Sequence, residues 1–348
     1  MAYRTAAPRT NHRPEVTAIL AALAERVRIA QSGFAWSRAR RRLDIARAHR
    51  DAIRMLEPWN DEVATAEVLE RLTALERERH ERGDDHGEGI AGALALKARH
   101  VESGAGSARA MPLWADALRC ARRVVASGGD LGTMTEVFGA ASRASRAHAD
   151  GPSHLFIAEE FLAAARAEGR AAVVQRALGD VAHALRATGQ SDRALELAVE
   201  RADAVFAARE RFDQQEIAEA CEQVLGLARE TGHLWACERY ARAWLEASEG
   251  ADEAAPRAAR SRAWAWSLAA ARDAGDPSRA VGVARAWVAD ERKRWTALGQ
   301  HEPQACRSLA DALDALAQEN DLHHRKSEAR RERVESDALR QRAAKGDG

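Results

Sequence analysis

The stretch RATG at residues 186–189 recurs as RETG at 229–232 and again as RDAG at 272–275. The three copies are 43 residues apart, and each ends in a glycine that an arginine precedes by three positions. Agreement over one constant offset indicates an internal repeat, because coincidence would not place the same two residue types at the same distance twice.

Two further features share this offset. A small residue stands five positions after each glycine, and the stretch ARAW at 241–244 recurs at 284–287. The register therefore predicts equivalent buried positions in successive repeats. These positions are Ala194, Cys237 and Ala280, then Leu178, Cys221 and Trp264, then Trp244 and Trp287.

Each repeat is long enough for two helices, one before the glycine and one after it. Glycine is favoured where a helix ends in a left-handed residue. A single helical hairpin cannot bury both of its faces, so neighbouring hairpins must stack. Small residues where the two helices cross let the backbones approach closely. The sequence therefore predicts an array of stacked antiparallel hairpins.

The remainder of the chain has the same helical character. Apolar residues recur with a period near 3.6, and no segment alternates apolar and polar residues as a strand would. Pro277 after Asp276 suits the first turn of a helix. We expect an all-α protein with helices at 14–31, 35–57, 60–82, 86–103, 108–127, 131–149, 153–168, 170–188, 191–209, 213–231, 234–248, 255–274, 277–297, 302–319 and 321–344.

The helix, the glycine turn and the small residue five positions later resemble tetratricopeptide repeats (TPR), most closely in 178–202. The 43-residue period exceeds the ~34 residues of ordinary members and is similar to the kinesin-light-chain-like variety. The segment LGQHEP at 298–303 resembles the linking loop of that variety, with Glu302 inserted before the proline. The resemblance implies a right-handed α-solenoid with a partner-binding groove and no chemistry. HEAT-like repeats have a compatible period and are the alternative.

The resemblance is good for 175–320, weaker for 86–170 and poor for 14–82. We therefore expect three parts. They are an N-terminal helical segment at 14–82, a TPR-like array at 86–320 and a charged C-terminal helix or tail at 321–348 that is partly frayed.

Composition narrows the function. Hydrophobic residues make up 46% of the chain, enough for a core, but aromatic residues make up only 5%, which suits alanine-rich helices in close contact. A formal net charge of 0 gives no global attraction to nucleic acid or membrane. The sequence offers no membrane span and no secretory signal, so we expect a cytoplasmic bacterial protein. Four scattered cysteines do not form a disulfide scaffold.

Motifs for catalysis and cofactors are missing from the sequence. There is no phosphate loop, no His-Glu-x-x-His pair, no paired Cys-x-x-Cys and no nucleophile elbow. We therefore expect no enzyme activity, no cofactor and no metal. Catalytic residues can converge from distant repeats, so this inference rests on motifs alone.

The N-terminal segment is rich in arginine. Nine arginines lie in 26–54, and Arg38, Arg40, Arg41 and Arg42 could contact phosphates. The segment that follows, 61–81, carries seven acidic residues, so the two helices could instead neutralise each other as an antiparallel pair. We favour internal pairing over nucleic-acid binding.

The repeated arginines Arg186, Arg229 and Arg272 are the candidate partner-binding residues, joined by Arg176, His183 and Arg262. The resemblance implies that the first helix of each hairpin lines the groove, where arginines would favour a peptide that carries carboxylates. An arginine in a last helical turn also stabilises the helix end, and both interpretations stay open.

The sequence thus predicts a non-catalytic protein- or peptide-binding repeat scaffold, an adaptor or regulatory module with an acidic partner. The alternative is a nucleic-acid-linked regulator that uses the basic N-terminal helix, with the repeats as its sensor.

Overall fold

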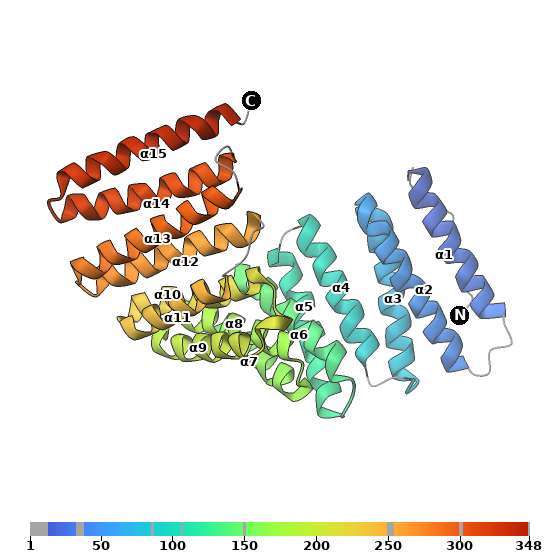
Figure 1. Cartoon of the computed structure of the whole chain (residues 1–348). Helices are drawn as coiled ribbons and strands as arrows, with labels where there is room; N and C mark the ends of the chain where they lie inside the picture. Colours follow the sequence, from blue (N-terminus) through green and yellow to red (C-terminus); the bar gives the residue numbers. More distant parts are fainter. Residues whose placement is uncertain are drawn as a thin grey trace. The chain divides into compact units, whose positions relative to one another are not determined.

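A computed structural model describes residues 13–32, 38–84, 87–105, 107–148, 151–248, 254–298 and 302–346. These residues form fifteen α-helices, two short 3-10 turns and no strand (Figure 1). The helices are α1 (Pro14–Ser32), α2 (Arg38–Leu56), α3 (Glu62–Glu81), α4 (Glu88–Ala105), α5 (Ser107–Ala126), α6 (Leu131–His148), α7 (Gly151–Glu168), α8 (Ala171–Ala187), α9 (Ser191–Ala207), α10 (Gln214–Thr231), α11 (Leu234–Ala247), α12 (Ala254–Asp273), α13 (Pro277–Leu298), α14 (Pro303–Leu322) and α15 (Lys326–Gly346), with η1 (Glu57–Trp59) and η2 (Arg209–Arg211) between them.

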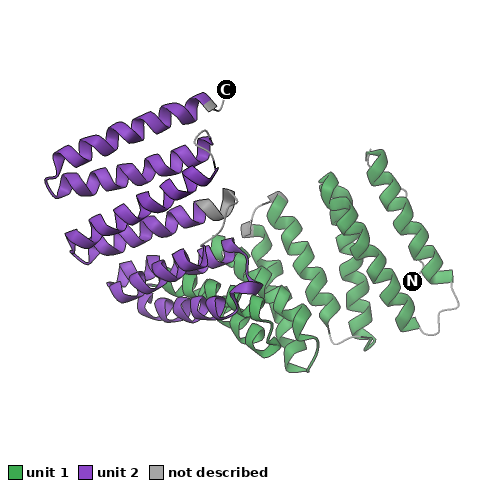
Figure 2. Cartoon of the chain, viewed as in Figure 1, with its two compact units in different colours: residues 1–188 green, residues 189–348 purple. Residues whose placement is uncertain are grey.

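The contacts divide the chain into two units, residues 1–188 and 189–348 (Figure 2). Unit 1 contains α1 to α8 and unit 2 contains α9 to α15. The three-part division at 82 and 320 stays a prediction. Each unit is described by itself below.

Unit 1 is a series of helices in which each packs against the next along the chain. Val16 and Ile19 of α1 share a core with Ala52 and Leu56 of α2 and with Val68 of α3. Small side chains at these contacts let successive helices lie close together. The result is a two-layer stack of hairpins, as the repeat predicts.

Unit 2 has the same construction. The hairpins α10–α11, α12–α13 and α14–α15 stack in chain order. Leu268 of α12, Trp287 of α13 and Leu313 of α14 belong to one buried cluster that also reaches Leu339 of α15. The middle hairpin, α12–α13, therefore packs against α10–α11 on one side and against α14–α15 on the other.

The glycines of the repeat adopt the predicted conformation. The φ angles of Gly189, Gly232 and Gly275 are 76°, 76° and 68°, so all three are left-handed. The small residues Ala194, Cys237 and Ala280 are buried. The order of helix, left-handed glycine and helix that the 43-residue offset predicts is confirmed.

The predicted register of buried residues is correct at four of its five large positions. Leu178, Cys221, Trp244 and Trp287 are buried. Trp264 is only partly buried. It packs against the core cluster of unit 2, and its indole N–H donates to the carboxylate of Asp290 at 3.0 Å.

The C-terminal segment is helical, as the helix expected at 321–344 predicts, and its partial fraying stays a prediction. It forms a regular helix, α15, that packs extensively on α14. Ala329, Ser336 and Ala343 are buried at intervals of seven residues, together with Leu339. The loop proposed to link repeats, around residues 299–301, lies outside the described residues. No helix in the described part of the chain is both long enough and apolar enough to cross a membrane.

Candidate binding groove on the inner helices of unit 1

The repeated arginines of unit 2 are bound to acids of neighbouring hairpins. Arg229 of α10 lies 2.7 Å from Asp273 of α12. Arg272 of α12 lies 2.5 Å from Glu319 of α14, a carboxylate that is almost wholly buried. These arginines thus connect successive hairpins through ion pairs.

Arg262 follows the same pattern. Its Nε lies 2.7 Å from a carboxylate oxygen of Glu222, so α12 is also tied back to α10. The three unit 2 arginines predicted to face a partner therefore already have partners inside the chain. Their predicted role towards a bound molecule is untested, and the ion pairs give them a structural one.

One layer of helices in each unit is more closely spaced than the other. In unit 1, α4 contacts α6 and α6 contacts α8, and in unit 2, α10 contacts α12. The helices of the second layer contact each other less. In a stack of hairpins, the layer with the closer helices is the inner one, which forms the concave surface of a repeat array.

The inner layer of unit 1 carries four exposed arginines, Arg99 on α4, Arg143 and Arg146 on α6, and Arg176 on α8. Within the described part of the chain, these four side chains form no ion pair and no hydrogen bond. We call these four residues the arginine cluster. Arg229, Arg262 and Arg272, by contrast, each form an ion pair.

Arg143 belongs to the repeat that the sequence analysis used. It stands 43 residues before Arg186, in the same place of the preceding hairpin. This earlier copy is hard to see in the sequence because Arg146 occupies the position where the later copies have glycine. The offset alone would have found it.

Like charges act on each other within the cluster. Burial lowers the pKa of Arg143, and the charges of Arg176 and Arg99 lower it further. Arg122 provides the contrast, because its two hydrogen bonds to Glu160 raise its pKa. Partial desolvation and the two neighbouring cations outweigh the attraction of Asp180 and Glu102 in their effect on the pKa of Arg143, so an added anion would stabilise its charged form.

The predicted residues His183 and Arg186 lie on the same helix as Arg176. His183 is half-buried, with its ring centroid 6.0 Å from that of the buried His154. Burial, followed by the charge of Arg146, lowers the pKa of both imidazoles. Arg186 is exposed near the end of α8 and has contacts within the chain. The structure thus brings His183 near the arginine cluster.

Asp180 is the acidic group closest to the cluster in the sequence of α8, and it is mostly buried. Its carboxylate accepts a hydrogen bond from the hydroxyl of Ser142 at 3.0 Å. Burial raises its pKa, and the hydrogen bond from Ser142 and the charges of Arg146 and Arg143 oppose that rise.

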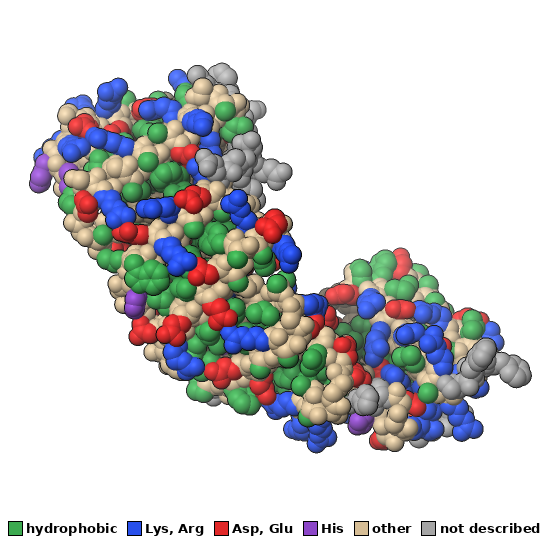
Figure 3. Space-filling view, turned by 60° about the horizontal axis from the view of Figure 1, so that its bottom comes forward, with side chains coloured by type: hydrophobic (Ala, Val, Ile, Leu, Met, Phe, Trp, Pro, Cys, Tyr) green, Lys and Arg blue, Asp and Glu red, His purple; other side chains and the backbone are tan. Residues whose placement is uncertain are grey.

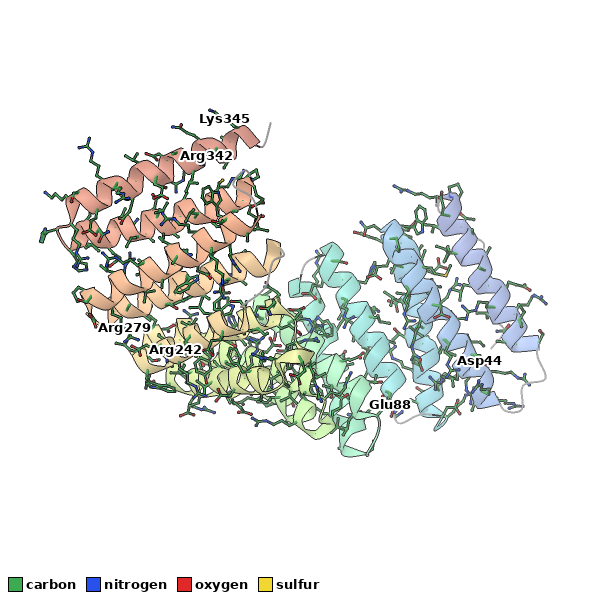
Figure 4. All side chains as sticks on the ribbon, viewed as in Figure 1. Asp44, Glu88, Arg242, Arg279, Arg342 and Lys345 are labelled. Atoms are coloured by element: carbon green, nitrogen blue, oxygen red, sulfur yellow. The ribbon has the colours of Figure 1, made fainter. Side chains whose placement is uncertain are left out.

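A cavity of about 780 Å³ lies beside the cluster. It is bounded by α2, the turn into α3, α4 and the start of α6, and Arg99 is part of its wall. Gly92 of α4 also lines it, and a Cβ atom added there would meet no atom within 4 Å. Glu88 lies at the start of α4 (Figure 4) and accepts a hydrogen bond from the backbone N–H of Asp130 at 3.0 Å.

The basic N-terminal helix α2 is paired mainly inside unit 1. Arg50 binds the buried carboxylate of Glu76 on α3, Arg42 binds Asp84, and Arg40 lies 3.5 Å from Asp44. This is the internal pairing that the sequence favoured. Arg38 is exposed and Arg41 is half-buried, and their contact with phosphates stays a prediction.

The distribution of surface charge agrees with this pairing. On the face seen in Figure 3, basic and acidic side chains alternate. Among the described residues, no group of three or more potential metal ligands lies together.

No model of a known protein family matches the chain, and no curated protein matches it by sequence. Solved structures do match. One is a signal-transduction ATPase with a tetratricopeptide-repeat sensor from Pyrococcus horikoshii, with a TM-score of 0.51 and 12% identity over 95% of this chain and 48% of that one. This chain therefore spans about half of that protein.

Two further structures are similar at lower scores. The apo form of RapI has a TM-score of 0.49 and 12% identity over 95% of this chain and 99% of that one. BtubC (BKLC) from P. vanneervenii has a TM-score of 0.44 and 15% identity over 69% and 91%. At sequence identities of 12–15%, structural similarity is evidence about the fold alone. Together with the stacked hairpins, it shows that the chain has the tetratricopeptide-like fold, an all-α right-handed solenoid.

Proposed function

We propose that this protein is a non-catalytic, cytoplasmic repeat scaffold, an adaptor or regulatory module, and that it binds a protein or peptide on the inner helices of unit 1. The observation that carries the proposal is the arginine cluster, four cations on three successive inner helices with no ion pair among the described residues.

Arginine suits such a site because its planar guanidinium can bind a carboxylate through two parallel hydrogen bonds. In unit 2 the repeated arginines form ion pairs with acids of neighbouring hairpins, which stabilises the stack, whereas the arginine cluster of unit 1 forms no ion pair among the described residues. The proposed partner-binding residues are therefore Arg99, Arg143, Arg146 and Arg176, with His183 and Arg186 beside them. Arg229, Arg262 and Arg272 are assigned to the cohesion of unit 2.

The experiment is affinity capture from a lysate of the native host, with the full chain immobilised. The site variant changes all four arginines of the cluster to Gln. The matched control changes four exposed arginines of unit 2 that have no ion pair among the described residues, Arg242, Arg330, Arg331 and Arg342 (Arg242 and Arg342 are labelled in Figure 4). Both variants remove the same charge, so a general electrostatic effect would appear in both.

We expect one or more proteins to bind the wild type and the control but not the site variant, with at least tenfold weaker affinity for the site variant when the purified partner is titrated. The proposal is wrong if the site variant retains every protein that the wild type captures. Capture of nucleic acid that disappears between low and moderate salt would favour the alternative regulator with a basic N-terminal helix.

A further inference from the structure

Part of the wall of the cavity beside the arginine cluster is acidic. Glu57, Glu62 and Glu136 line it, and all three are exposed. Within the described ranges, their carboxylates form no ion pair or hydrogen bond. Arg50 and Arg54 also line the cavity, but Glu76 and Asp51 already bind them.

The free charges are thus separated by sign. Glu57 and Glu62 come from the turn that joins α2 to α3. Arg99 lies in the second half of α4, and Arg143 and Arg176 continue on α6 and α8. Going from the turn between α2 and α3 to the inner helices α4, α6 and α8 of unit 1, the charges without an ion pair change from acidic to basic, with Glu136 as an acidic group in the first half of α6.

We propose that the cavity and the arginine cluster together bind a peptide segment of mixed charge, with its acidic residues against Arg99, Arg143 and Arg176 and a basic residue against Glu57 and Glu62. This inference rests on the proposed function and specifies its partner. A uniformly acidic segment would place carboxylates beside Glu57 and Glu62, and like charges across an interface disfavour binding.

The space fits such an occupant. Ligand cavities have volumes of about 300–1,000 Å³, and the 780 Å³ here accommodates several side chains. Gly92 has no side chain to fill the cavity beside α4, and a Cβ atom added there would meet no atom within 4 Å. Arg99 belongs both to the cavity wall and to the charges that lower the pKa of Arg143, so the two parts of the site are continuous.

The test selects peptides from a display library of random 12-residue sequences on the immobilised full chain. We expect the enriched peptides to contain an acidic block and a basic residue in separate halves. Arg143→Glu should enrich peptides with fewer acidic residues, whereas Glu57→Lys with Glu62→Lys should remove the preference for the basic residue. Arg242→Glu on α11 is the control and should select the same peptides as the wild type.

A second measurement separates charge from shape. The best selected peptide, labelled for fluorescence anisotropy, should bind Gly92→Phe at least tenfold more weakly than the wild type. Gly226→Phe is the matched control, because Gly226 lies inside helix α10 and a Cβ there also meets nothing within 4 Å. Thermal unfolding of both variants checks the fold, and neither should unfold earlier than the wild type because glycine is a poor helix former.

The outcomes separate this inference from the proposed function. Uniformly acidic peptides that lose affinity with Arg143→Glu would overturn the mixed-charge inference and support a site for acidic partners. A library with no enrichment over the uncoated surface would also overturn it, while host-protein capture would still decide the proposed function. Peptides that bind all variants equally would overturn the inference and place binding elsewhere.

Discussion

Arg260 donates two hydrogen bonds to the carboxylate of Asp290, at 2.7 and 2.8 Å, and so joins α12 to α13 in a bidentate pair. Its third nitrogen donates to the backbone carbonyl of Leu245 on α11 at 2.7 Å. The arginine is buried, and one guanidinium therefore holds three consecutive helices of unit 2.

Arg260→Ala should lower the free energy of unfolding of unit 2 by about 3 kcal/mol. This is the lower end of the range for a broken buried ion pair, because Asp290 keeps its hydrogen bond from Trp264. Urea unfolding at pH 7 measures the change. Arg285→Ala is the control, since Arg285 and its partner Glu328 are both about half exposed and such pairs contribute at most about 1 kcal/mol. Equal losses in the two variants would contradict this ranking.

The stability difference between the wild type and Arg260→Ala should depend on pH. Burial raises the pKa of Asp290, but the hydrogen bonds from Arg260 and Trp264 lower it more, so it lies below its ordinary value. A depressed carboxyl pKa stabilises the fold fully above the unfolded value, near 3.9, and the stabilisation is lost as the pH falls through the folded value. The difference should be constant from pH 7 to 5 and shrink below about pH 4. A difference that grows on acidification would show the opposite sign.

Gly232→Ala should destabilise unit 2 by about 1–2 kcal/mol, because an L-residue is strained at the left-handed angle of 76°. A Cβ there meets no atom, so the cost is the backbone alone. Gly232→Asn should recover part of the loss, since asparagine tolerates this conformation. Gly226→Ala in the same helix should instead stabilise by about 0.5–1 kcal/mol. Chemical denaturation of the three variants tests the opposite signs.

Trp244→Ala should cost about 3–5 kcal/mol, because the side chain is fully buried. Trp235, in the first turn of the same helix, is 53% exposed, and Trp235→Ala should change stability by no more than about 0.5 kcal/mol. Thermal and urea unfolding followed by circular dichroism would compare them. A large loss from Trp235→Ala would mean that the exposed face of α11 is covered by another molecule in solution.

Arg272→Ala and Arg143→Gln should affect stability in different directions. Removing Arg272 leaves the buried carboxylate of Glu319 without its closest cation, which should cost about 1–3 kcal/mol. Removing the charge of Arg143 relieves repulsion from Arg99 and Arg176, so the protein should be as stable as the wild type or more stable. Melting temperatures of the two variants check this, and a fall with Arg143→Gln would mean that Arg143 supports the fold.

The sequence was sufficient for the helices and for the repeat. The constant spacing of the glycines predicted where the hairpins turn. A left-handed backbone conformation at the end of a helix favours glycine, so each repeat carries a glycine at the same place. It was insufficient for the buried seam of α15, since Ala329, Ser336 and Ala343 are small residues that a search for apolar periodicity passes over. It was also misleading at Trp264, where alignment with Cys221 ignored the size of the indole and its need for an acceptor.

The candidate site was harder to predict. The repeat identified arginines at equivalent places, but their acids come from other hairpins, as Asp273 does for Arg229 and Glu319 for Arg272. Only the three-dimensional arrangement distinguishes an arginine that is paired from one that is not. Arg143 escaped notice because its own turn lacks the glycine that marked the others.

Helix α15 covers an apolar face of α14 that would otherwise be exposed. Its inner side covers Leu313 and Ala310 of α14, while its outer side carries exposed charges such as Arg330 and Arg333. A stack of hairpins with an uncovered apolar face would adhere to the equivalent face of another molecule and could grow into filaments. A chain shortened before Lys326 should therefore self-associate in a concentration-dependent way more readily than the full chain, in which α15 covers this face with a charged outer side.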